Sequence, residues 1–395
     1  MSLLKNISDS AKAKFQDVLF PTRKDEYWRF ADFSAWSVDT LFPYFMCKPV
    51  ETGGDEAFAE LQKDDGAEGT IVLFDGQLLG ANVPRGVEVR TMGAAAEVYP
   101  DLIEKFHNNN CGKFDLLNAT RPDAGIVISV LDGESAKLSL KIISKLSVSI
   151  SSVLVLLGEG SRLNLTKTNL AFGGCFSDVK CGYELAKDTT LELASQKYSS
   201  KHAITYERED FYLGENSRLI DAAAYACGGS MRSERNFKFN KRDAMADSRA
   251  FVLGAGEFTR DIRTSQVHEF APAKSNLEVR AALDGKANLA FTGLIRVEES
   301  AGGTEAYQAC RSLMLSDDAK SQASPILEIL SNDVACSHGC TVAKPSEEQM
   351  FYMAQRGINP ETARTLLVRS FAETTFEKLS DRDAVDCILK NIFGE

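Results

Sequence analysis

The sequence predicts a mainly β protein, in which a β-helix (β-solenoid) core lies between helical N- and C-terminal regions. Three observations support this fold class. A short strand–turn–strand unit recurs through the middle of the chain, and its strands alternate apolar and polar residues. Residues typical of helix starts gather near the C-terminus. We therefore divide the chain into a helical and mixed N-terminal domain (1–110), a β-helix core (111–340) and a C-terminal helical domain (341–395).

The N-terminal region combines a helix with one recognisable strand. Residues Ser8 to Leu19 are expected to form a short amphipathic helix. The pair Gly53-Gly54 and the polar stretch Gln62 to Gly69 are typical of a loop or linker. The run Thr70 to Phe74 is rich in β-forming residues and is followed by Asp75-Gly76, a favourable turn pair.

The repeat lies between about residues 119 and 335. Each unit has a leucine followed by a polar turn and a new strand, and the first four leucines are 26, 28 and 28 residues apart. The leucines of the five units are Leu131, Leu157, Leu185, Leu213 and Leu283. One unit is too small to bury its own apolar side, whereas stacked units bury a continuous core. The spacing favours a β-helix over a closed barrel, with a β-sandwich as the alternative.

The C-terminal region carries three helix start patterns. Ser346 to Gln349 fits a capping box, Asn359-Pro360 fits an N-cap before a first-turn proline, and Ser380 is expected to begin a third helix. The second helix should present Ala363, Leu366, Leu367, Ser370 and Phe371 on one face, and the third should bury Val385, Ile388, Leu389 and Ile392. We expect this helical pack to cover the open end of the solenoid and its unpaired strand edges.

Composition excludes several classes of protein. The 395 residues are 44% apolar and 26% charged, which excludes disorder, collagen and coiled coil. The longest aliphatic run, Val153 to Leu157, is far shorter than the roughly 20 residues of a membrane helix. A net charge of −11 argues against a broad nucleic-acid surface, and the first residues lack a secretory pattern. We therefore expect a cytoplasmic protein that binds neither membrane nor nucleic acid.

The chain has nine cysteines and four histidines. An odd number of cysteines, spread over a long chain, argues against a disulfide framework and for a reducing compartment. We expect Cys47, Cys227, Cys310 and Cys387 to serve as small buried apolar residues.

The densest reactive group is Cys336-Ser337-His338-Gly339-Cys340. In an extended strand, Cys336, His338 and Cys340 would project from one face. Thiolate and imidazole are ligands for zinc, copper and iron–sulfur clusters, so a metal or redox role is one reading. A buried turn with two inert thiols is the other. A Cys-His hydrolase is weaker, because the base of such a dyad is oriented from a different element.

Other candidate residues are less specific. Cys175 and Cys181 are spaced too loosely for a zinc knuckle, and His202 and His268 lie singly, as core or surface histidines do. The sequence has no G-x-x-x-x-G-K-[ST] phosphate loop and no G-x-S-x-G elbow. The acidic residues Asp221, Asp243 and Asp261 would line a groove in a β-helical carbohydrate-active enzyme, but we interpret them as solenoid turn residues.

Three segments share their order with a known family. The first is P-T-R-K-D-E-Y-W-R-F (Pro21 to Phe30), and the second is A-Y-Q-A-C-R-S-L-M-L-S (Ala306 to Ser316) followed by P-I-L-E-I (Pro325 to Ile329). The third runs from Val334 through Cys-Ser-His-Gly to Arg356-Gly357-Ile358, and ends in the helix Ala363 to Phe371. Together they resemble the SufB/SufD family of iron–sulfur cluster assembly scaffolds, and specifically its SufD branch.

The resemblance implies a right-handed parallel β-helix and no free-standing enzymatic activity, and hence no catalytic residues. It also implies pairing with a SufB-like subunit through the β-helix, and binding of the SufC-like ATPase through the C-terminal helices, where we assign Arg364, Leu367 and Phe371 to the contact. A homodimer in isolation is a further expectation. The location would be cytoplasmic, or the plastid stroma if the source bears plastids.

The resemblance also assigns roles within the cysteine-rich strand. Cys336 and His338 match the family's Cys-Ser-His-Gly motif, so His338 is the leading candidate for a ligand of a transient iron–sulfur cluster at the subunit interface, with Cys336 in support. Cys340 stands where the family more often has alanine, and we interpret it as an incidental extra thiol. No cofactor is expected to be tightly bound in the isolated chain. A stand-alone metal-binding protein is the remaining alternative.

Overall fold

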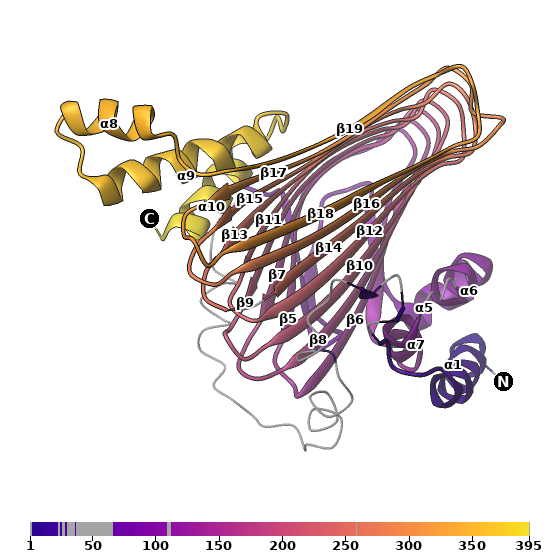
Figure 1. Cartoon of the computed structure of the whole chain (residues 1–395). Coiled ribbons are helices and arrows are strands. Elements are labelled where there is room, and N and C mark those ends of the chain that lie inside the picture. The colour runs from indigo at the N-terminus through magenta and orange to yellow at the C-terminus, as the bar shows by residue number, and fades with distance from the viewer. Residues whose placement is uncertain are drawn as a thin grey trace.

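The computed structural model describes residues 2–22, 24–25, 28–29, 36, 66–108, 112–257 and 259–394. In this part of the chain, two long sheets wind around a shared interior as a β-helix, with helices before and after it (Figure 1). The predicted β-helix is confirmed. The β-sandwich alternative is wrong, because the repeated strands of each sheet run parallel to their neighbours.

From β4 onward, consecutive strands alternate between the two sheets, so two strands complete one turn of the β-helix. Sheet A consists of β1 (Gly69–Phe74), β2 (Gln77–Asn82), β5 (Ser135–Ser144), β7 (Arg162–Ala171), β9 (Thr190–Ser199), β11 (Arg218–Cys227), β13 (Met245–Gly254), β15 (Lys274–Leu283), β17 (Thr304–Met314) and β19 (Val334–Ala343). Sheet B consists of β3 (Val87–Thr91), β4 (Gly125–Val130), β6 (Val148–Leu157), β8 (Phe176–Leu185), β10 (Ile204–Leu213), β12 (Ser230–Phe239), β14 (Thr259–His268), β16 (Asn288–Val297) and β18 (Lys320–Ile329).

The strand register explains the leucine repeat. Leu157 lies opposite Leu185, and Leu185 lies opposite Leu213, all in sheet B. At the start of the repeat, Val130 rather than Leu131 lies opposite Leu157, so the first predicted leucine is displaced by one residue. Leu283 ends a strand of sheet A, so the fifth unit belongs to the turn on the opposite side of the β-helix.

The turns that lead from sheet B to sheet A are stacked and share one backbone conformation. Gly160, Asp188 and Asn216 have φ of 69°, 58° and 53°, in the left-handed region that glycine, asparagine and aspartate tolerate best. The N–H of Gly160 donates to Lys187 O in the next turn, and the N–H of Asp188 donates to Glu215 O in the turn after it. This recurrent geometry accounts for the polar turn residues of the repeat.

The interior is filled by every second side chain of each strand, as the alternation predicts. Leu163, Leu191 and Leu219 are in register in sheet A and fully buried. From sheet B, the rings of Tyr183, Phe211 and Phe237 stack with centroid distances of 4.6 and 4.9 Å. Stacked identical positions therefore form one continuous core.

The N-terminal helices lie on the outer face of sheet B. Those within the described residues are α1 (Leu3–Asp17), α5 (Met92–Val98), α6 (Pro100–Asn108) and α7 (Lys113–Ala119). Ile7, Ile103 and Phe106 pack there against Val127 and Leu154. The predicted helix exists, but it begins at Leu3 rather than at Ser8. The predicted strand before Asp75-Gly76 is confirmed as β1, whereas most of the predicted linker, and part of the Pro21–Phe30 motif, lie outside the described residues.

The C-terminal helices are α8 (Glu347–Gln355), α9 (Pro360–Phe376) and α10 (Arg382–Phe393). The side chain of Ser346 accepts a hydrogen bond from the Gln349 N–H, and that of Asn359 accepts one from Thr362, so both predicted N-caps are confirmed. The predicted N-cap of the third helix is wrong by one residue. Asp381 caps α10, because the N–H and hydroxyl of Ser380 donate instead to Glu192 on β9.

Helices α9 and α10 pack on the outer face of sheet A, where Ala222, Phe251 and Ala282 meet Val368 and Ile388. The predicted face of α9 is partly wrong, because Leu366 is exposed. The residues buried on α9 are Ala363, Val368, Ala372, Thr375 and Phe376.

The prediction that these helices cover the open end of the β-helix is also wrong. Within the described part of the chain, β18 and β19 each pair with a single strand and form an uncovered last rung. None of the described helices is long and apolar enough to span a bilayer.

Candidate functional site

The last strand of sheet A contains the predicted cysteine and histidine group. Strand β19 pairs with β17 in unbroken register, so Cys336, His338 and Cys340 lie opposite Ala306, Gln308 and Cys310. The three residues of β17 are buried and face the interior of the β-helix. The residues of β19 continue this face at the open rung, where Cys336 is half-buried and His338 and Cys340 are exposed.

Both thiols of this strand are held in their neutral form. Burial raises the pKa of Cys336, and a hydrogen bond from the Ala306 backbone opposes the shift. Burial likewise raises the pKa of Cys340, against a hydrogen bond from the Cys310 backbone. Neither thiol is therefore an activated thiolate in the isolated chain, and a metal ion or a cationic partner would increase its thiolate fraction.

The spacing along the strand limits what these residues can bind alone. Alternate residues of a strand are separated by about 6.6 Å, so Cys336 and Cys340 lie about 13 Å apart, too far for both sulfurs to lie about 2.3 Å from one zinc ion. Among the described residues, no group of three or more His, Cys, Asp or Glu side chains is arranged to hold a metal ion. The described residues therefore show no complete metal site at this strand.

The expectation of buried apolar cysteines is confirmed for Cys227 and Cys310. Cys175, Cys181 and Cys227 are buried thiols, and burial raises the pKa of Cys175 and of Cys181 to about 12. Cys310 is also buried, and Cys387 is half-buried on α10. Cys47 and Cys111 lie outside the described residues.

The single histidines have structural surroundings. His268 faces the interior, where its Nε2 is 2.9 Å from Ser275 Oγ and its ring stacks on Phe239 at 4.1 Å. Burial lowers its pKa to about 4, so it is a neutral core residue at pH 7. His202 lies exposed in the turn between β9 and β10.

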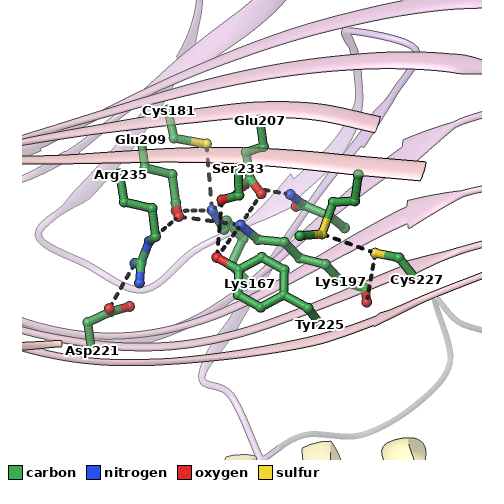
Figure 2. A network of polar contacts seen from close by, with 12 residues as sticks. Lys167, Cys181, Lys197, Glu207, Glu209, Asp221, Tyr225, Cys227, Ser233 and Arg235 are labelled. Atoms are coloured by element: carbon green, nitrogen blue, oxygen red, sulfur yellow. Dashed lines mark hydrogen bonds and ion pairs between the residues drawn. The ribbon is translucent and has the colours of Figure 1, made fainter. Parts of the chain in front are cut away.

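A buried network of charges lies inside the β-helix, and the sequence analysis missed it (Figure 2). Lys167 contacts Glu207 at 2.9 Å and also forms an ion pair with Glu209. Lys197 contacts the same two carboxylates. Arg235 joins Glu209 to Asp221, with a distance of 2.8 Å to each carboxylate. Three cations thus face three carboxylates, and the network joins sheet A to sheet B.

The charges of this network depend on one another. Burial alone would raise the pKa of Glu209, but Lys167, Lys197 and Arg235 outweigh it and hold this pKa well below its usual range. Burial would lower the pKa of Lys197, but Glu207 and Glu209 raise it. Asp221 has one cation partner, Arg235, and there burial prevails and raises the pKa.

The alternation of inward-facing and outward-facing residues along each strand could have predicted this network. Leu163 and Leu165 face the interior, so Lys167 does as well. The interpretation of the acidic residues as turn residues is wrong for two of three. Asp221 lies inside β11, and Asp261 lies in β14, paired with Arg232, whereas Asp243 is in a turn with φ of 60°. None of these residues forms the open carboxylate groove of a carbohydrate-active enzyme.

The predicted partner-binding residues differ in their exposure. Arg364 is exposed and Leu367 is half-buried. Phe371 packs toward sheet A, where the Arg280 guanidinium lies 5.1 Å from its ring centroid.

The neighbouring helix α8 buries none of its side chains and stands clear of the sheets (Figure 1). Its Phe351 and Tyr352 are 65% and 56% exposed, and Leu366 on α9 is 45% exposed. The sequence did not predict that these three residues are exposed, and it placed Leu366 on the packed face of its helix, because apolar residues in a helix are usually buried.

Comparison with known proteins shows that this chain is similar to members of one family. Residues 141–371 match the model of the SufBD core domain of the SUF system for FeS cluster assembly. The chain is 24% identical over 420 residues to Protein ABCI7, chloroplastic, of Arabidopsis thaliana, with 99% of this chain and 86% of that protein covered.

Two bacterial relatives match shorter segments. The iron–sulfur cluster assembly protein SufD of Escherichia coli is 26% identical over 202 residues, which cover 51% of this chain and 47% of that protein. SufD of Bacillus subtilis is 28% identical over 166 residues, which cover 42% and 38%. The matched core domain extends from β5 through α9 and includes the open rung. The chain therefore belongs to the SufB/SufD family of iron–sulfur cluster assembly proteins.

Proposed function

We propose that this chain is a SufD-like scaffold subunit that pairs with a SufB-like subunit and binds a SufC-like ATPase. The observation that carries the proposal is the open last rung. His338 is exposed there, between two cysteines, on the inward face of a strand that pairs on one side only among the described strands. The names of the two SufD relatives support placement in the SufD branch.

The edge of the last rung is suited to pairing with a second β-helix. Strands β18 and β19 present backbone groups to which no described strand pairs, and such edges recruit further strands. Beside this edge, Ile326, Leu327 and Leu330 are partly exposed apolar residues. A SufB-like subunit is the proposed partner, and a second copy of this chain takes its place in isolation.

The helical pair α8–α9 is the proposed ATPase contact. Helix α8 stands clear of the β-helix, and the pair exposes Phe351, Tyr352 and Leu366. Arg364 is exposed as well. Aromatic and arginine side chains are enriched in the energetically important centres of protein interfaces. Phe371 would support this contact from the face of α9 that packs against sheet A. The half-buried Leu367 lies between this packed face and the exposed surface of the helix.

The iron–sulfur cluster is a transient cargo in this proposal. His338 would serve as a ligand, with Cys336 and Cys340 beside it, and the partner would supply the remaining ligands. The chain itself would not be an enzyme and would hold no cluster tightly when isolated. It would work in the cytoplasm, or in the plastid stroma if its source bears plastids.

Co-expression of the tagged chain with the SufB-like and SufC-like proteins of its own source tests the proposal. We expect both to co-purify in a stable complex. Deletion of residues 345–395 should release the ATPase and retain the SufB-like subunit, provided that the shortened chain stays folded by circular dichroism. If the full-length chain captures neither protein, the proposed function is wrong.

A further inference from the structure

Two thiols lie opposite each other in the last strands of sheet A. Cys310 of β17 and Cys340 of β19 are direct partners in the parallel register, on the inward face. A hydrogen bond from the Cys310 backbone reaches the Cys340 sulfur, and the two thiols interact electrostatically. Cys310 is buried, whereas Cys340 is exposed at the open rung.

The strand spacing permits a bond between these sulfurs. Neighbouring strands lie about 4.7–4.9 Å apart, within the range of about 4.4–6.8 Å between the Cα atoms of disulfide-bonded cysteines. The Cβ atoms must approach to about 3.8 Å, so β19 has to tilt toward β17. It can do so because, among the described strands, it has a neighbour on one side only.

A third thiol on the same strand provides an internal comparison. Cys336 lies opposite Ala306, so it faces a methyl group rather than a sulfur. It is also four residues from Cys340, about 13 Å along an extended strand, which excludes a bond between these two. The arrangement is therefore specific to Cys310 and Cys340.

We propose that Cys310 and Cys340 form a reversible dithiol–disulfide site that responds to peroxide. Hydrogen peroxide reaches Cys340 first, because it is the exposed member, and oxidises its thiol to a sulfenic acid with release of one water. The Cys310 thiol then attacks that sulfur, the S–S bond forms, and the hydroxyl leaves with the Cys310 proton as a second water. An external thiol reduces the bond and restores both cysteines.

The chemical consequence is a covalent link between the last two strands of sheet A. The link would lie two residues from His338, and thus within the open rung. The disulfide site itself does not depend on the proposed function, because it follows from the register of two strands of this chain.

The test uses the full-length chain, oxidised with hydrogen peroxide, alkylated and mapped by peptide mass spectrometry without reduction. We expect a peptide pair linked through Cys310 and Cys340, which dithiothreitol separates. Cys336→Ser should retain this linked pair, whereas Cys310→Ser and Cys340→Ser should each abolish it. In Cys310→Ser, Cys340 should instead accumulate as sulfenic or sulfinic acid.

Binding of phenylarsine oxide, which bridges two neighbouring thiols, provides a second measurement on the reduced protein. The wild type and Cys336→Ser should bind it, and Cys310→Ser should not. The proposal is wrong if peroxide converts wild-type Cys340 to sulfinic acid while Cys310 stays a free thiol. It is equally wrong if Cys340 links to a cysteine other than Cys310.

Discussion

Lys167 and Glu209 form an ion pair inside the β-helix, and neither side chain is exposed to solvent. The pair joins β7 of sheet A to β10 of sheet B. Transfer of ions out of water costs several kcal/mol for each ion, so such a pair persists only where further partners surround it. Lys197 and Arg235 provide these partners for Glu209.

Loss of one member should therefore be far more costly than loss of a surface charge. We expect Lys167→Met to lower the free energy of unfolding by about 3–5 kcal/mol, because it leaves carboxylates buried without their cation. The control is Lys187→Met, which removes a half-exposed ion pair with Glu215 and should change stability little. Urea unfolding followed by circular dichroism measures both. Equal midpoints for the two variants would contradict the prediction.

The buried imidazole of His268 should make stability depend on pH. Burial lowers its pKa to about 4 in the folded state, against about 6.5 in an unfolded chain. As the pH falls from 6.5, the unfolded state takes up the proton first, so the folded state loses stability between pH 6.5 and 4. Above pH 6.5 this histidine lowers the stability of the folded state little. At pH 4 it lowers the free energy of unfolding by about 3 kcal/mol.

Urea midpoints at pH 7 and pH 5 measure this dependence. His268→Gln should be less stable than the wild type at pH 7 but should lose less stability between the two pH values. His202→Gln changes an exposed histidine and should keep the wild-type pH dependence. A His268→Gln protein with an unchanged difference between the midpoints would exclude the histidine as the cause.

The left-handed backbone at Asn216 predicts an unusual order of substitutions. Its φ is 53°, and its side chain donates to Asp188 Oδ1 at 2.6 Å in the turn below. Asn216→Ala keeps a Cβ atom in this conformation and should lower stability by about 1–2 kcal/mol. Asn216→Gly also loses the hydrogen bond but relieves the backbone, so it should be the more stable of the two. Thermal melts of both variants decide the order, and a more stable alanine variant would contradict the assigned turn geometry.

Much of the fold follows from local pattern. The 28-residue spacing from Leu157 to Leu185, and from Leu185 to Leu213, indicates stacked rungs directly, because parallel strands in register repeat at the length of one turn. The N-caps at Ser346 and Asn359 were also evident, since capping depends on a few neighbouring residues. The positions of the helices were not evident. Which face α9 buries is decided by the alanines of sheet A, more than 80 residues earlier in the chain.

The candidate site was predictable in part for the same reason. Cys336, His338 and Cys340 share one strand, so their common face follows from period-two alternation. The partner of Cys340 was not predictable, because the opposition to Cys310 depends on the register between two strands. The open end of the β-helix was not predicted. The apolar pattern of a helix does not show which surface of the protein that helix packs against.

The role of His338 can be separated from the stability of its strand. His338→Ala should reduce cluster assembly in the complex with the SufB-like subunit by about tenfold or more, because loss of even an outer-shell partner commonly costs about 10–100-fold at metal sites. Ser337→Ala is the matched control, as Ser337 is exposed on the same strand but faces outward. Iron and acid-labile sulfide content of the purified complex is the measurement. Equal cluster content in the two variants would remove His338 from the ligand set.

The exposed aromatic residues of α8 should matter for binding and not for folding. Phe351→Ser changes a side chain that is 65% exposed, so the unfolding midpoint should stay near that of the wild type while capture of the SufC-like ATPase weakens by about tenfold. Phe371→Ser should instead destabilise the chain, because this ring packs toward sheet A. Phe270→Ser alters a phenylalanine that is 51% exposed in the turn between β14 and β15, and should affect neither property. Pull-down titrations with the ATPase rank the three variants. If Phe351→Ser binds as the wild type does, the contact lies elsewhere than on α8.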